Sequence, residues 1–337
     1  MSKINNTTDY ASVTPVDGDL LIGTDVSNTA TDANGETVTF LMSAVKTYVL
    51  TGAGTALELY AENPSTPTAP SATGTNSLAI GDEAVSAGTN TIALQRSYAS
   101  GEESFAAAIA NNSASYGATG ANSVALGPRA KAPGGQGIAM GFSAWAYGAR
   151  SFAVSNNAQA TGTDSIAIGR STKATETASV ALGFAAASLI SGKLAYTGKS
   201  LGGLGSAQTG TFVLMSNTTD ATATALTTTN SAAGTTNQII LPDNSAYAFH
   251  GTIIARQQAS AGTACAAWKV EGLIRREGSA GTTVLVNSAT TILDNTPAWG
   301  MALTADTTNG GLKIEVTGAA ATNIRWVATI NTSEVTY

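Results

Sequence analysis

Apolar residues recur through the middle of the chain at a fixed interval. Cassettes of the form small–apolar–Ala–apolar–Gly, or close to it, begin at eight positions: Ser77, Thr91, Ser104, Ser123, Gly137, Ser151, Ser165 and Ser179. The last five starts are evenly spaced, and a longer step between Thr91 and Ser123 indicates an insertion. A period of ~14 residues is too short for two helices but suits two short strands and two turns. The period therefore predicts the coils of a parallel β-solenoid.

The alternation within a cassette determines which side chains share a face. Val124 and Leu126 lie on one face of their strand, and Ala125 lies on the other. We predict that the two larger residues fill the coil and that the alanines form an outer wall without bulk. Such a wall would let another backbone approach closely, so we expect several chains, most simply three, to pack together. The alternative is a monomeric solenoid that merely tolerates alanine on its outside.

The pattern before the repeats predicts a small unit over residues 1–60. Asp17–Val26 and Asn34–Phe40 favour strands, the second opening with an Asn-Gly turn, and the apolar spacing over Leu41–Leu50 is helical. Residues 61–75 carry three prolines and are typical of a stiff neck. The repeats then define a shaft over residues 76–190, followed by a junction over residues 191–208.

Residues 209–337 lose the period and alternate as about eight short strands separated by turns. This pattern predicts a C-terminal β-sandwich, jelly-roll-like, so the whole chain is expected to be all-β apart from the short helix near its start. Trp268, Trp299 and Trp326 are candidates for its core. The alternative is that one of them is exposed and stacks on a sugar.

Composition narrows the classes of function. Only 11% of residues are charged, the net charge is −6, and no run of Lys or Arg occurs, so we expect no binding to nucleic acid. No apolar run approaches the ~20 residues of a membrane helix, and the N-terminus has no apolar signal segment, so neither membrane insertion nor secretion is expected. The single cysteine, Cys265, permits no disulfide within one chain, and we expect it to be a small buried residue.

Little in the sequence predicts catalysis. With one histidine, His250, and one cysteine, a His-rich metal site or a Cys–His dyad is unavailable within a chain. We therefore expect no cofactor and no enzyme activity. The alternative is a polysaccharide depolymerase with distant carboxylates, such as Asp243, Asp294 and Asp306, united in a cleft between subunits.

Charged residues gather modestly in the C-terminal region. They are Arg256, Lys269, Glu271, Arg275, Arg276, Glu277, Lys313, Glu315 and Arg325. They are interpreted as a solvated face or as ion pairs between subunits. The other interpretation is a polar site for an anionic surface glycan.

The cassettes resemble the head repeats of trimeric autotransporter adhesins, in which S-V-A-I-G and A-x-A-x-G motifs alternate within a repeat of the same length. Here the second motif is seen, for example, at Ala144, Ala146 and Gly148. The resemblance covers roughly residues 71–190 and implies a left-handed parallel β-roll with three copies in a homotrimer. Those adhesins also carry a secretory signal and a membrane-anchoring barrel, neither of which is recognisable here.

A fibre made in the host cytoplasm with such repeats resembles a bacteriophage fibre. The segment Asp17–Val49 is similar to a strand-loop-strand-helix module at the start of phage fibre proteins, and the C-terminal region is similar to a β-rich terminal domain of phage structural proteins. We expect the first unit to dock on another virion protein and the last domain to contact a glycan or protein of the host surface, as in a tail fibre. Other interpretations are a head fibre or capsid decoration protein, and a bacterial adhesin, which the missing signal disfavours. The candidate docking residues are Leu20, Ile22, Val38, Phe40, Val45 and Tyr48.

Overall fold

The computed structural model describes residues 20–25, 36–41, 68–107 and 115–337, which belong to two units, Met1–Glu62 and Asn63–Tyr337. In the first unit, strands β1 (Leu20–Asp25) and β2 (Glu36–Leu41) form an antiparallel pair. Both strands that the sequence predicts are present, and β2 extends to Leu41. After Leu41, the rest of the helix predicted over Leu41–Leu50 lies outside the described part of the chain.

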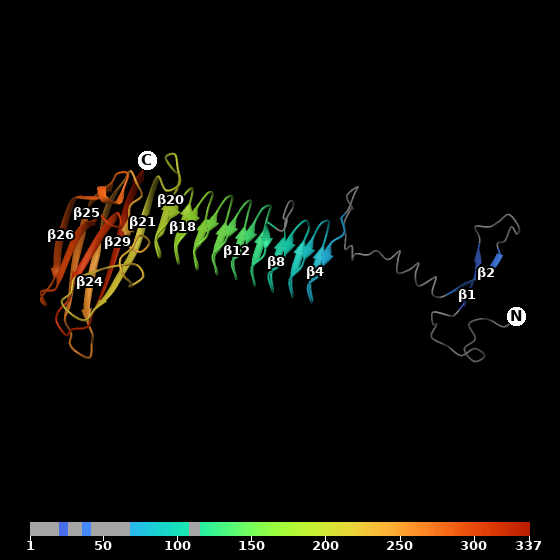
Figure 1. The fold of residues 1–337 in the computed structure, drawn as a ribbon, viewed down its shortest axis with the longest axis horizontal. Coiled ribbons are helices and arrows are strands. Elements are labelled where there is room, and N and C mark those ends of the chain that lie inside the picture. Colours follow the sequence, from blue (N-terminus) through green and yellow to red (C-terminus); the bar gives the residue numbers. More distant parts are fainter. Residues whose placement is uncertain (1–19, 26–35, 42–67, 108–114) are drawn as a thin grey trace. The chain divides into compact units, whose positions relative to one another are not determined.

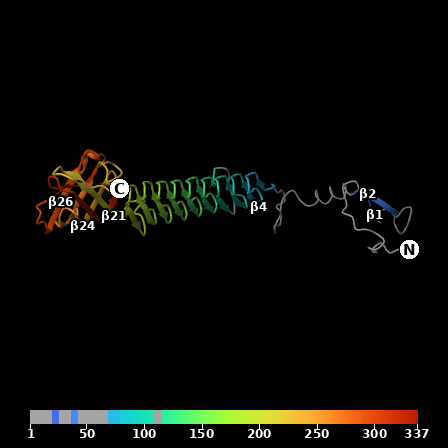
Figure 2. The same cartoon turned by 90° about the horizontal axis from the view of Figure 1, so that it is seen from below.

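The second unit begins with a solenoid of nine coils, each of which contributes one strand to each of two parallel sheets (Figures 1 and 2). We call the sheet built by the cassettes the cassette sheet; over the coils it consists of β4 (Leu78–Ile80), β6 (Ile92–Leu94), β8 (Phe105–Ala107), β10 (Val124–Leu126), β12 (Ile138–Met140), β14 (Phe152–Val154), β16 (Ile166–Ile168), β18 (Val180–Gly183) and β20 (Leu194–Thr197). The other, the mid-repeat sheet, consists of β3 (Ser71–Ala72), β5 (Val85–Ser86), β7 (Tyr98–Ala99), β9 (Gly117–Ala118), β11 (Lys131–Ala132), β13 (Trp145–Ala146), β15 (Gln159–Ala160), β17 (Lys173–Ala174) and β19 (Ala187–Ser188).

Register follows the sequence period. Ala125 pairs with Ala139, which pairs with Ala153, so equivalent residues of successive coils stack directly. The predicted parallel solenoid is therefore confirmed. The insertion falls between β8 and β10, where Phe105 pairs with Val124, further along the chain than one repeat period. The left hand implied by the resemblance stays a prediction.

The cassettes face the opposite way from our prediction. The central alanines, such as Ala125 and Ala153, are fully buried inside the coil. The flanking residues point outward, where Leu78 and Ile168 remain 42% and 39% exposed. The physical reason is the width of a coil built from such short strands: the space between its two sheets admits methyl groups, and larger side chains must stay outside. Alanine therefore forms the core, and the prediction of an outer alanine wall is wrong.

The corners of the coils are held by small residues. At the first cassette position, the Ser123 hydroxyl donates to the carbonyl of Gly120 at 2.6 Å, and the Ser165 hydroxyl donates to that of Gly162 at 2.7 Å. Gly148 packs so closely on the next coil that an added Cβ would lie 1.8 Å from the carbonyl oxygen of Gly162. The fixed positions of Ser and Gly in the repeat thus reflect hydrogen bonding and close backbone approach.

The cassette sheet does not stop at the last coil. Strand β20 pairs in parallel with β18 and in antiparallel with β21 (Ala207–Thr218). The sheet continues through β29 (Ile324–Thr336), β24 (Ser245–Gln257), β25 (Cys265–Arg276) and β26 (Val284–Asp294), which gives 14 strands in all (Figure 1). This continuation pairs the open edge of the last coil, which would otherwise invite association with other strands.

A smaller sheet packs on the antiparallel part. It contains β22 (Thr224–Ala225), β23 (Ile239–Ile240), β28 (Gly311–Thr317) and β27 (Gly300–Asp306), and a single 3₁₀ turn, η1 (Ala280–Thr282), precedes β26. The two sheets share one hydrophobic core, and the described residues contain no α-helix. The observed strand order does not show the jelly-roll topology that the sequence led us to expect.

Three tryptophans lie at the centre of this core. Trp268, Trp299 and Trp326 are at most 5% exposed, and the rings of Trp268 and Trp326 stack with centroids 5.8 Å apart. The prediction that they form the core is confirmed. Cys265, at the start of β25, is exposed, so the prediction of a buried cysteine is wrong. Cys265 lies on the same exposed face of β25 as Lys269 and Glu271, because residues two apart share one side of a strand.

Candidate functional site

The outer face of the cassette sheet is apolar along the whole solenoid. The outward residues are Leu78, Ile80, Ile92, Leu94, Phe105, Ala107, Val124, Leu126, Ile138, Met140, Phe152, Val154, Ile166, Ile168, Val180, Leu182, Leu194 and Tyr196; we call them the apolar rows. None carries a charge, and all are half-buried or exposed. A contiguous apolar surface of this length is rare on a monomeric soluble protein and marks an interaction site.

The outer face of the mid-repeat sheet carries charged and polar side chains over its middle coils. Lys131, Trp145, Gln159 and Lys173 follow one another in register along it. The ammonium of Lys131 lies 5.3 Å from the ring centroid of Tyr147, which in turn packs edge-on against Trp145. Charged and amphipathic side chains suit a face that stays in contact with water. The solenoid is therefore two-sided, with one face suited to burial and the other to solvent.

A polar pocket of about 560 Å³ opens beside one end of the C-terminal strands β21, β24 and β29. It is lined by Asn217, Thr218, Thr219, Arg256, Gln257, Gln258, Ala259, Asn323, Ile324 and Arg325. The lining contains amides, hydroxyls and two guanidinium groups, and it contains neither a carboxylate nor an aromatic ring.

The two arginines of this pocket come from neighbouring strands. Arg256 in β24 pairs directly with Arg325 in β29, and Arg325 pairs with Asn217 in β21, so these side chains share the outer face of the sheet. Arg256 donates weakly to the carbonyls of Gly262 and Ala264, at 3.4 and 3.3 Å. Neither guanidinium forms an ion pair with any residue that the structure describes. The pocket thus holds two positive charges without a countercharge.

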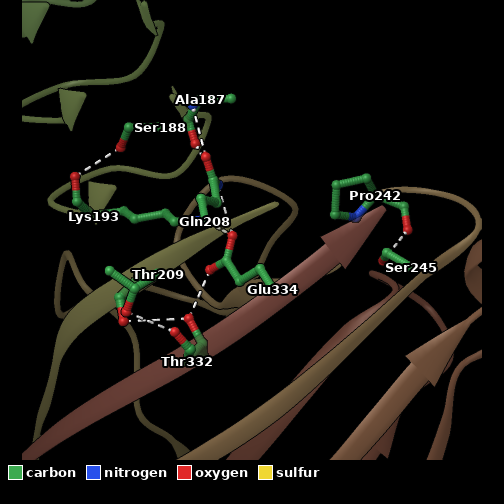
Figure 3. A network of polar contacts seen from close by, with 10 residues as sticks. Ala187, Ser188, Lys193, Gln208, Thr209, Pro242, Ser245, Thr332 and Glu334 are labelled. Carbon is green, nitrogen blue, oxygen red and sulfur yellow. Dashed lines mark hydrogen bonds and ion pairs between the residues drawn. The ribbon is translucent and has the colours of Figure 1, made fainter. Parts of the chain in front are cut away.

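A buried polar network joins the last coil to the C-terminal domain (Figure 3). The ammonium of Lys193 lies 2.6 Å from Glu334 Oε2, and both side chains are at most 4% exposed. Gln208 Nε2 donates to the same carboxylate at 2.7 Å, and Gln208 Oε1 accepts the backbone N–H of Ala187 at 2.8 Å. The Thr332 hydroxyl donates to Glu334 Oε1 at 2.7 Å. The carboxylate is therefore satisfied from both parts of the unit.

Burial controls the titration of this network. Loss of water lowers the pKa of Lys193, and the adjacent Glu334 carboxylate opposes that shift. Burial, with a further contribution from Glu334, raises the pKa of Tyr247 well above its usual value, so its phenol stays protonated. The Lys193 ammonium also lies 5.3 Å from the ring centroid of Phe212 and 5.7 Å from that of Tyr247. The network is a structural joint whose charged pair is enclosed by aromatic rings.

The sequence carries a signal for this joint that our prediction did not use. A ninth cassette, K-L-A-Y-T, begins at Lys193, one repeat period after Ser179. In the earlier coils the first cassette position is a small residue, whose hydroxyl in several coils donates within its own corner, as that of Ser179 does to the carbonyl of Glu176. In the last coil a lysine at the same position reaches out to Glu334 instead. A charged residue at a buried repeat position indicates the coil at which the solenoid contacts another domain.

The carboxylates considered for catalysis each have a local partner. Asp243 pairs with Arg276 at 2.6 Å. Asp294 accepts the Thr296 hydroxyl at 2.8 Å, and Asp306 accepts the backbone N–H of Asn309 at 2.9 Å. The latter two carboxylates therefore stabilise turns within one chain.

Other side chains that could take part in catalysis or metal binding are also dispersed. His250 is exposed in β24, between Asn331 and Glu271 of the neighbouring strands. Over the described ranges, no group of three or more His, Cys, Asp or Glu residues could hold a metal ion. In the same ranges, no helix has the length and hydrophobicity that crossing a membrane requires.

Comparison with known proteins identifies the repeats. The family model for the YadA head domain repeat matches residues 72–94, 118–144, 132–154 and 160–186, all within the solenoid. The expected resemblance to adhesin head repeats is confirmed over these segments. No curated protein matches the chain in sequence.

Two solved structures are similar over most of this chain. The tailspike protein gp49 of Acinetobacter baumannii bacteriophage Fri1, a capsular polysaccharide depolymerase, is 13% identical with a TM-score of 0.24, over 75% of this chain and 39% of that one. The tailspike protein of Acinetobacter baumannii phage AM24 is 10% identical with a TM-score of 0.21, over 78% of this chain and 54% of that one. This chain thus spans less than two thirds of the length of either tailspike.

These comparisons correct one expectation. The prediction that the chain is not an enzyme is contradicted, because one of the tailspikes similar to it is a polysaccharide depolymerase. At TM-scores this low the similarity transfers no catalytic residue to this chain.

Of the candidate docking residues, Leu20, Ile22, Val38 and Phe40 lie in the β1–β2 pair. Val45 and Tyr48 lie outside the described residues.

Proposed function

We propose that the chain is a homotrimeric phage tail fibre. In this proposal the solenoid is the shaft, the C-terminal domain contacts the host surface, and the first unit docks on another virion protein. The observation that carries the proposal is the pair of apolar rows above an alanine core. It is supported by the matched YadA head repeats, which resemble the heads of trimeric adhesins.

The energetics of a single coil favour association. Its core consists mainly of alanine methyl groups, and each buried CH₂-sized group contributes ~0.8 kcal/mol. Ordering the backbone costs ~1–2 kcal/mol for each residue of a coil. Hydrogen bonds between coils recover part of this cost. Covering the apolar rows with two further copies adds the missing hydrophobic burial and leaves the polar mid-repeat sheet facing water.

Three copies suit the geometry of a one-sided rod. Each solenoid offers one apolar face along its length, and cyclic symmetry brings equivalent faces together around a closed axis. Successive coils have the same register, so every coil meets its own equivalents in the other copies. This arrangement gives a stiff fibre whose two ends are free for different contacts.

The ends of the chain supply those contacts in the proposal. The β1–β2 pair contains Leu20, Ile22, Val38 and Phe40, which we propose as docking residues on the virion together with Val45 and Tyr48. At the other end, the C-terminal domain is joined rigidly to the shaft by the continuous sheet and by the buried Lys193–Glu334 pair. A domain held in this way transmits the orientation of the shaft to the surface that it contacts.

Infection experiments test the placement and the role. Antibodies against the chain, carried on gold particles, should label the tails of virions in electron micrographs; label on the capsid would instead indicate a head fibre. Purified protein added to host cells before the phage should reduce the number of plaques, because it occupies the receptor. Undiminished infection with saturating protein would contradict the role in host contact.

A further inference from the structure

We propose that the polar pocket between Asn217, Arg256 and Arg325 binds an anionic saccharide, whose carboxylate or phosphate group is held by the two guanidinium groups. This inference rests on the proposed host contact and names the chemistry of that contact. In the sequence the two arginines are far apart and do not stand out among nine charged residues. The strand register brings them together.

Two like charges opposite each other on a sheet are unfavourable. Arg256 and Arg325 are a directly opposed pair on adjacent strands, an arrangement that destabilises a sheet unless something neutralises it. Asp220, which directly follows Thr219 of the lining, accepts the backbone N–H of Thr222 within its own turn and is not itself part of the lining. A negatively charged ligand would supply the countercharge that the described residues lack.

The rest of the lining suits a sugar. Guanidinium groups bind carboxylate and phosphate through paired, planar hydrogen bonds. Around them, the side chains of Asn217, Thr219, Gln257 and Asn323 offer amide and hydroxyl groups that can both donate to and accept from ring hydroxyls. The volume of about 560 Å³ lies within the range of small-ligand sites. Because no aromatic ring lines the pocket, a neutral sugar would have no surface on which to stack, so charge must dominate recognition.

Three hexoses that differ only at C6 test the proposal. Glucose, glucuronate and glucose 6-phosphate present the same ring with a hydroxyl, a carboxylate or a phosphate. We expect ligand-observed NMR on the full-length protein to detect binding of glucuronate, of glucose 6-phosphate or of both, at least tenfold tighter than glucose. Which of the two binds identifies the anion as carboxylate or phosphate. Equal binding of all three, or binding of neither anion, would overturn the proposal.

Variants locate the site. Arg256→Gln and Arg325→Gln should each weaken binding of the anionic hexose at least tenfold. Lys269→Gln removes an exposed positive charge from the outer face of the same sheet, outside the pocket, and should leave the affinity within about twofold. Equal losses in all three variants would indicate a general charge effect and would also overturn the proposal.

Stability measurements separate binding from folding. Without ligand, Arg325→Gln should leave the melting temperature unchanged or raise it, because it relieves a like-charge contact. A fall in melting temperature would assign the arginines a structural role instead. Failure of the sugar experiments together with a successful infection block would leave the fibre function intact and remove only this ligand class.

Discussion

Ala153 and Val154 are neighbours in β14, yet one is fully buried and the other points out of the coil. Side-chain volume decides between these positions, because the space inside the coil is filled by methyl groups from both sheets. Alternation in the sequence shows which residues share a face. It does not show which face is inside, and our prediction placed the larger apolar residues there.

This assignment predicts opposite outcomes for two neighbouring substitutions. Ala153→Ile should destabilise the fold by about 1–3 kcal/mol or prevent folding, because the added carbons overpack the coil. Val154→Ile adds one methylene at an outward position and should cost less than about 1 kcal/mol. Thermal unfolding of both variants at equal protein concentration provides the measurement. A larger loss for Val154→Ile would reverse the assignment of the faces.

Lys193 and Glu334 illustrate what residue-level reasoning can and cannot find. The lysine stands at a repeat position where a small residue is expected, so the sequence marks it as exceptional. Its partner is 141 residues away, and only the folded sheet brings them together. The candidate arginines of the pocket show the same limitation, because their pairing depends on the register between β24 and β29.

Removal of one member of the buried pair should be costly. Lys193→Met leaves the Glu334 carboxylate buried without its countercharge and should destabilise the protein by about 3–5 kcal/mol. The matched control is Lys313→Met, which breaks the partly exposed pair with Glu315 and should cost about 0–1 kcal/mol. Chemical denaturation of both variants provides the comparison. Equal losses would contradict a special role for the joint.

At the scale of elements, the repeat was the most predictable part of the fold. Its period fixes the strands, turns and register of nearly every coil, because contacts are made with the neighbouring coil only. The C-terminal domain was less accessible: its strands were recognisable, but β21 pairs with β29, so that Phe212 lies opposite Ile330. Pairing between residues so far apart in the chain depends on packing in three dimensions, which a pattern along the chain does not encode.

Close approach between coils gives a further prediction. Gly148→Ala would place a Cβ 1.8 Å from the carbonyl oxygen of Gly162, so the coils must separate locally. We expect a loss of about 1–3 kcal/mol in unfolding free energy. Gly198→Ala is the control, since nothing lies within 4 Å of an added Cβ there, and it should change stability by less than about 0.5 kcal/mol. A harmless Gly148→Ala would show that the coils are not packed as described.

For the whole molecule, the two faces of the solenoid make different predictions. Ile138→Glu together with Ile166→Glu places charges in the apolar rows and should dissociate the trimer, because burying these carboxylates without partners is unfavourable. Lys131→Glu together with Lys173→Glu changes charges on the mid-repeat sheet and should leave the assembly intact. Sedimentation velocity at several concentrations distinguishes the two results. Dissociation by the second pair alone would show that the interface lies on the mid-repeat sheet and would contradict the proposed one.

The most direct test of trimeric assembly is the mass of the full-length protein in solution, measured by light scattering after size-exclusion chromatography. The chain has a mass of 33.6 kDa, and we predict a particle of three chains, about 101 kDa, that persists on dilution. A particle of 33.6 kDa at all concentrations would contradict the trimer, since the apolar rows would then lie open to water on a stable monomer.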